Sequence, residues 1–247
     1  MEISSILRCP EMNKNQQIFE DFNSFLLTIK GIDPRMFEYG IFFNLKIFGL
    51  QEMHLRTLDK AKELEEAQKR ESVQAKSVLE SGAVFFANTD KSYKETIAYF
   101  EAYLNALYSI LQVITRIAYL LYQTQGKPLP FDWDRITFGD LKSHLEQKPT
   151  HDPDFSSYLS QKMSWYSSFK NNRHKITHNG SALLLFTQNG EIEFLDYPKD
   201  GTGFGVLTIN KQGLQIHLTD NFRGLFDLLE FFMKHFSQSF KCVINKK

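Results

Sequence analysis

This 247-residue chain has few cysteines and no excess of positive or negative charge. The only cysteines, Cys9 and Cys242, lie near opposite ends and form no CxxC pair. This spacing argues against a zinc ribbon or a disulfide framework and favours a reducing compartment. Lys and Arg number 29, as do Asp and Glu, so the formal net charge is zero. Neutrality argues against a protein that coats nucleic acid through bulk positive charge.

Several signatures of catalysis are also missing. The sequence has no GxxxxGK[ST], HExxH or GxSxG motif and no EF-hand loop. The glycine-rich segment 201–205 opens no helix, so a flexible turn is expected there rather than a phosphate-binding loop. No metal or cofactor is expected.

Membrane and export signals are absent by the same reading. No basic segment followed by an apolar stretch stands near Met1. The most apolar stretch, Ile97–Tyr122, contains polar residues that a membrane span would not tolerate cheaply: Glu101, Asn105, Gln112 and Arg116. We therefore expect a cytoplasmic protein with no membrane partner.

Aromatic residues are abundant, and most apolar residues follow helical spacing. The 23 Phe and 10 Tyr predict a large aromatic core or interface. A capping box at Thr137-x-x-Asp140 and the pair Asp152-Pro153 mark two helix starts. Residues 39–50 fit a strand or a helix, with helix favoured. Helices are predicted over 18–29, 53–80, about 90–125, 137 onward, 152 to about 179, and from 219 to the C-terminal region.

After Gly180 the spacing of apolar residues changes from that of a helix to that of short strands. Residues 182–186 and 192–197 flank Asn189-Gly190, which is a strong hairpin signal. Residues 206–209 and 214–218 flank 211–213 as a second predicted hairpin.

These patterns predict a mainly α protein, an up-and-down helical bundle with a small antiparallel β-hairpin insertion before the last helix. Residues 1–85 are expected to form an N-terminal helical region packed on the bundle. Residues 86–247 are expected to form the bundle itself, with the β insertion at about 181–219.

One stretch carries the candidate chemistry. Residues 155–190 contain no Asp or Glu, yet they hold Lys162, Lys170, Arg173 and Lys175. On a helix, His174 and His178 share a face, whereas Arg173 and His178 lie about 140° apart. Arginine can hold a phosphate bidentately, and histidine can exchange a proton near neutral pH.

The segment from Arg173 to His178 resembles the R-x4-6-H motif of the HEPN superfamily (higher eukaryotes and prokaryotes nucleotide-binding domains), including a polar residue directly after the arginine. The resemblance implies a helical bundle with the motif on a late helix. It also implies a metal-independent endoribonuclease that acts as a homodimer on RNA or a nucleotide. Arg173 and His178 would be the catalytic pair and His174 a helper. Lys170, Asn172 and Lys175 are the expected substrate-binding residues.

Other interpretations stay open. The same residues suit a catalytically silent dimeric module that binds a partner, a nucleotide or RNA. In that module Arg173 and His174 lie near the helix C-terminus, where cations are stabilised, and the lysines are solvated. A metal enzyme using His174 and His178 lacks a visible third ligand.

Overall fold

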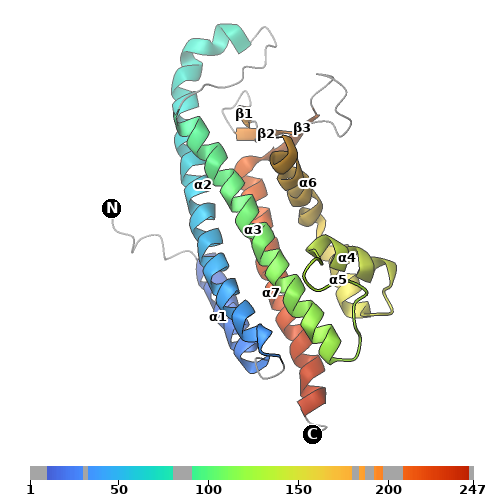
Figure 1. Cartoon of the computed structure of the whole chain (residues 1–247). Coiled ribbons are helices and arrows are strands. Elements are labelled where there is room, and N and C mark those ends of the chain that lie inside the picture. Colours follow the sequence, from blue (N-terminus) through green and yellow to red (C-terminus); the bar gives the residue numbers. More distant parts are fainter. Residues whose placement is uncertain are drawn as a thin grey trace. The chain divides into compact units, whose positions relative to one another are not determined.

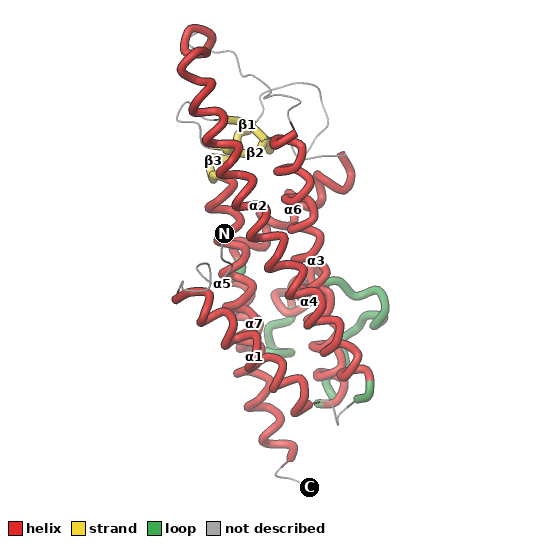
Figure 2. The backbone as a smooth tube through the Cα atoms, turned by 90° about the vertical axis from the view of Figure 1, so that its left-hand side faces the viewer, coloured by secondary structure: helices red, strands yellow, loops and turns green. Residues whose placement is uncertain are grey.

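The computed structural model is mainly helical, which confirms the mainly α part of the predicted fold class. It describes the backbone of residues 10–29, 33–79, 91–179, 184–186, 192–196 and 208–244, and the side chains within 14–29, 33–66, 91–174 and 213–238. The helices are α1 (Pro10–Ile29), α2 (Arg35–Leu79), α3 (Lys91–Thr124), α4 (Phe138–Gln147), α5 (Pro153–Lys162), α6 (Ser164–Asn179) and α7 (Leu214–Ile244) (Figure 1). The strands are β1 (Leu184–Phe186), β2 (Ile192–Asp196) and β3 (Thr208–Gly213), and Figure 2 shows how small a part of the backbone they form.

The chain forms two compact units, each built from separate stretches of sequence. Unit 1 comprises Met1–Ile47, Tyr108–Ser164 and Arg223–Lys247; unit 2 comprises Phe48–Leu107 and Trp165–Phe222. Helices α2, α3 and α7 therefore each contribute to both units. The predicted domain boundary near residue 85 falls outside the described residues and stays a prediction.

Aromatic side chains form much of the core of unit 1. Phe22 of α1 is fully buried, and its ring centroid lies 4.4 Å from that of Phe43 on α2 and 6.1 Å from that of Phe232 on α7. Phe155 of α5 lies 6.1 Å from Phe232 at a near-perpendicular angle. These edge-to-face and tilted contacts add to the hydrophobic gain from burying the rings.

The core of unit 2 joins α2, α3 and α7 through a histidine and its neighbours. The His54 ring stacks on Phe222 with centroids 4.2 Å apart and lies 5.6 Å from Tyr103. The buried Tyr103 hydroxyl donates to the carbonyl of Leu218 at 3.1 Å.

The structure confirms the predicted capping box at the start of α4. The Thr137 side chain accepts from the amide of Asp140, and the Asp140 carboxylate accepts from the amide of Thr137, which forms the capping box of α4. Gly126, with φ of 71°, follows the end of α3 in the left-handed conformation that favours glycine.

Replacing Thr137 with alanine is expected to lower the free energy of unfolding by about 1 kcal/mol, because a first-turn amide loses its side-chain acceptor. Urea unfolding measures the change. Ser160→Ala, at an exposed position in α5, is the control. Equal midpoints for the two variants would contradict a stabilising role for the cap.

The second predicted hairpin is wrong, because residues 214–218 are helical and open α7. Leu214, His217, Leu218 and Asn221 are buried with helical spacing, whereas Ile216 is 59% exposed. The Thr219 hydroxyl donates to the carbonyl of Gln215, so Thr219 lies inside the helix and does not cap it. Apolar residues alternate in this short segment, and packing of every third or fourth residue against the core favours helix over strand.

The strands that do form are short. β1 pairs antiparallel with β2, with Leu184 opposite Phe194, and β2 pairs antiparallel with β3, with Leu195 opposite Ile209. The connecting residues, including Asn189-Gly190 and segment 201–205, lie outside the described part. The predicted hairpin insertion therefore stays a prediction.

Two predicted helical segments have different bounds in the structure. The ambiguous residues 39–50 are helical and belong to the single 45-residue α2. In contrast, the helix predicted from residue 152 to 179 is broken at Met163, which ends α5 before α6 begins at Ser164.

Helix α3 has the length and apolar composition of a membrane span. In the 18-residue window that meets this criterion, 61% of the residues are buried inside the structure. The same composition serves a core helix, so the predicted cytoplasmic location stays a prediction.

Candidate functional site

Helix α6 carries the sequence motif without interruption. It runs from Ser164 to Asn179, so the backbone of all residues from Arg173 to His178 is helical. The helix contains no acidic residue. The side chains of Lys175 and His178 lie outside the described part, whereas their backbone positions on the helix are described.

Packing separates the motif into an inner and an outer side. Tyr166, Phe169 and Asn172 are buried, and Arg173, whose position around the axis lies between those of Tyr166 and Phe169, is half-buried. Lys170 and His174 are exposed. Because helical residues advance by about 100°, the position of His178 falls about 80° from that of Lys170 around the axis.

The backbone of α6 places the positions of His174 and His178 one turn apart on the same side of the helix. The position of Arg173 lies about 140° from that of His178 around the axis, so the helix does not bring the predicted catalytic pair to one side.

Asn172 occupies a packing position. Its amide nitrogen lies 3.5 Å from His217 Nε2, and the Asn221 amide nitrogen lies 2.9 Å from the same atom. Both asparagines and His217 are buried. Burial lowers the pKa of His217 to about 4, so its neutral imidazole accepts from an amide.

Unit 1 contains a polar cluster that sequence reasoning missed, which we call the Asp152 cluster (Tyr122, Asp152 and His235). The Tyr122 hydroxyl donates to Asp152 Oδ2 at 2.6 Å, and His235 Nε2 lies 2.7 Å from the same oxygen. Asp152 Oδ1 accepts from the amide of Phe155 at 3.0 Å as the N-cap of α5. One carboxylate therefore joins α3, α5 and α7.

The electrostatics favour an ionised Asp152. Burial acts to raise the pKa of this carboxyl, but hydrogen bonds from His235, Tyr122 and the Phe155 amide together hold it below its usual value. Burial, followed by the nearby carboxylate, raises the pKa of Tyr122, so its hydroxyl stays a donor. The Asp152-Pro153 signal predicts the cap, but nothing in the spacing indicates partners 30 and 83 residues away.

Two further histidines stand beside this cluster. His144 and His151 pack edge to face with ring centroids 5.1 Å apart, and His151 also contacts the ring of Tyr122. Burial is the main cause that lowers both pKa values, with Lys148 acting on both and Lys127 on His151. Cations beside two neutral imidazoles disfavour a bound metal ion.

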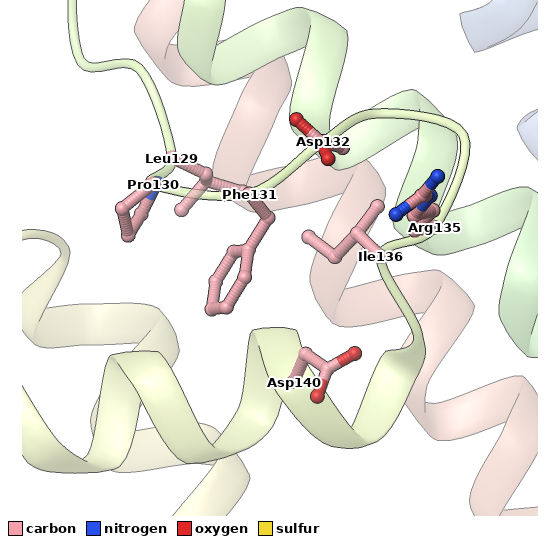
Figure 3. Close-up of a pocket in the computed structure, with 7 residues that line it drawn as sticks. All are labelled: Leu129, Pro130, Phe131, Asp132, Arg135, Ile136 and Asp140. Atoms are coloured by element: carbon pink, nitrogen blue, oxygen red, sulfur yellow. The ribbon is translucent and has the colours of Figure 1, made fainter.

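No metal site is found among the described side chains, since no three of their His, Cys, Asp and Glu residues are grouped to hold an ion. An open hollow of about 520 Å³ lies between α4 and the preceding loop (Figure 3). Asp140 comes from α4, and the loop provides the other lining residues: Leu129, Pro130, Phe131, Asp132, Arg135 and Ile136. The Asp140 carboxylate accepts from the amide and hydroxyl of Thr137, so it serves the cap of α4.

Comparison with known proteins finds no matching family model, no matching curated protein and no matching solved structure. The proposed function therefore rests on the α6 motif and the residues around it.

Proposed function

We propose that this chain is a HEPN-like protein that binds RNA along the outer face of α6 and cleaves it without a metal. The observation that supports this most is the continuity of α6 through the motif: Lys170 and His174 are exposed, and the position of His178 follows one turn after His174 on an acid-free helix. Lysines at this spacing suit phosphates along an RNA backbone, and a small basic surface is compatible with zero net charge.

The histidines suit a cleavage reaction on the 2′-hydroxyl. In the proposed step His178 takes the proton from a ribose 2′-OH, and that oxygen attacks the adjacent phosphorus. The bond from phosphorus to the 5′-oxygen breaks, and an acid protonates the leaving oxygen. The products carry a 2′,3′-cyclic phosphate and a 5′-hydroxyl.

The position of His174 makes it a source of that proton, because it lies one turn from His178 on the same face. A second copy of the motif in a homodimer is the alternative source. Arg173 stabilises the charge that develops on the phosphate, extending from beside the inner face. Lys170 and Lys175 contact neighbouring phosphates. Because its amide is buried beside His217, Asn172 positions the helix and is left out of the RNA contacts.

The proposal includes the up-and-down order of the bundle, the β insertion at about 181–219, a cytoplasmic location and a homodimer. It needs no cofactor.

The test is cleavage of a fluorescent single-stranded RNA in EDTA. Arg173→Ala and His178→Ala are each expected to lower the rate about 100-fold, as is typical for loss of a general base or of a charge-stabilising group. His174→Ala is expected to lower it less if the second copy supplies the acid.

Arg223→Ala is the matched control, because Arg223 is an exposed arginine on α7 outside the motif. An intact rate is expected for this variant. Equal cleavage by the wild type, Arg173→Ala and His178→Ala proteins would show that any activity comes from elsewhere.

A second function is favoured by a different observation. Several large apolar side chains of α2 are exposed, among them Leu45 at 68% and Phe48 at 72%. Such side chains are typical of an interaction surface, and with Arg173 and His178 on different sides of α6 they suit a catalytically silent binding module. RNA binding that depends on Lys170 and Lys175, without cleavage products, would select this function.

A further inference from the structure

The exposed apolar side chains of α2 form a stripe along one side of the helix, defined here as Phe37, Ile41, Leu45 and Phe48. They are exposed by 55%, 47%, 68% and 72% respectively. At about 100° per residue they fall within an arc of about 80°, and they span about 16 Å along the axis. The buried face of the same helix, marked by Met36, Phe43 and Ile47, points the opposite way.

We infer that this stripe is the contact through which two copies of this chain pair, with their α2 helices antiparallel. The inference rests on the homodimer of the proposed function and gives it a contact made of residues outside the α6 motif, so it does not depend on RNA cleavage. Three properties of the stripe identify a second copy as its partner.

The first property is its symmetry. The stripe reads Phe, Ile, Leu, Phe, with an aromatic ring at each end and a branched aliphatic side chain at each inner position. A two-fold axis near residues 42 and 43 places Phe37 opposite Phe48 of the other copy and Ile41 opposite Leu45. Each side chain then meets an apolar partner, as a self-complementary two-fold interface requires.

The second property is area. Since a full aromatic side chain presents about 150–250 Å², the exposed parts of the four residues amount to on the order of 400 Å² per copy. Two copies would bury about 800 Å² from the stripe alone. This area lies at the low end of the range for interfaces, where weak and reversible contacts are found.

The third property is charge. Between residues 37 and 48 no charged residue lies within the arc. The charges beside it are acidic: Glu38 lies about 20° beyond its edge, and Glu52, one turn after Phe48, has a side chain that is 41% exposed and pairs with Arg56. Lys46 projects about 140° from the centre of the stripe. A helix that lies on anionic lipid carries cations beside its apolar face, so this pattern disfavours a membrane surface and suits a protein surface that is equally apolar.

The oligomeric state of the full chain tests the inference, measured by sedimentation at micromolar concentration. The wild type is expected to be a dimer. Leu45→Glu is expected to raise the dissociation constant at least about 100-fold, because each interface then receives two carboxylates against apolar side chains. Phe42→Glu is the matched control: Phe42 is also apolar and 49% exposed, but it projects about 100° from the stripe, so its variant is expected to remain a dimer.

The pairing register has its own test. Ile41→Lys and Leu45→Glu are each expected to weaken self-association. A mixture of the two variants is expected to restore a dimer, because the introduced lysine of one copy would face the introduced glutamate of the other. Arg173→Ala and His178→Ala proteins are expected to stay dimeric, so loss of cleavage and loss of pairing are distinguishable.

Three results would overturn the inference. They are a monomeric wild type at these concentrations, an unchanged dimer for Leu45→Glu, and a wild type that binds vesicles of phosphatidylcholine and phosphatidylserine through the stripe instead of pairing. Circular dichroism of each variant confirms that the fold is kept, which is expected because the replaced side chains are on the surface.

Discussion

Asp152→Ala is expected to lower the free energy of unfolding by about 3–5 kcal/mol, which is the range for removing one partner of a buried charged network. The substitution removes the N-cap of α5 and leaves the hydroxyl of Tyr122, a fully buried residue, without its acceptor. It also removes the carboxylate that holds His235, whose side chain is only 14% exposed.

Denaturant unfolding of the full chain, followed by circular dichroism, measures this change. Asp152→Asn keeps a cap acceptor but loses the charge, so we expect an intermediate loss of about 2 kcal/mol. Asp154→Ala is the matched control, because Asp154 also lies in the first turn of α5 but is exposed. A loss below about 1 kcal/mol for Asp152→Ala would mean that the cluster does not hold the three helices together.

Acidification from pH 7 to pH 4 is expected to remove about 4 kcal/mol of stability through His54 and His217 together. Burial lowers both pKa values to about 4, against about 6.5 in an unfolded chain. Between these values the unfolded chain binds more protons, so stability falls as the pH decreases through this window. Full linkage would give about 3 kcal/mol for each histidine, and partial relaxation around the charged ring reduces that figure.

Replacing His54 with phenylalanine separates this effect from general acid unfolding. The new ring keeps the stack on Phe222 and no longer titrates, so the loss of stability between pH 6.5 and 4 is expected to shrink by about half. Phe222→Leu is the control, because it alters the packing around the same site while the imidazole remains. His217→Phe is expected to lower stability even at pH 7, since Asn221 would lose its buried acceptor. An unchanged pH profile for His54→Phe would assign the acid sensitivity to other groups.

Signals that act over three or four residues were predicted from the sequence because both partners lie in one turn of chain. Thr137 with Asp140 and the Asp152-Pro153 start of α5 are of this kind. Segment 214–218 was predicted as a strand, since its apolar residues alternate, and only packing against the core shows that Ile216 faces outward and the segment is helical.

For the motif on α6, too, some properties are visible in the sequence and others depend on packing. Its residue types, spacing and lack of acids are visible in the sequence, and they predict which helix positions share a face. The burial of Asn172 beside His217 depends on a residue 45 positions away.

The mainly helical class, the helix starts at residues 138 and 153 and the lack of acidic residues in α6 follow from composition or from neighbours along the chain. Tertiary structure alone decided that Tyr122 and His235 meet Asp152, that His54 and His217 are buried, and that one stripe of α2 stays exposed. The physical reason is that these properties arise when distant segments remove one another from water, and no local spacing records which segments those are.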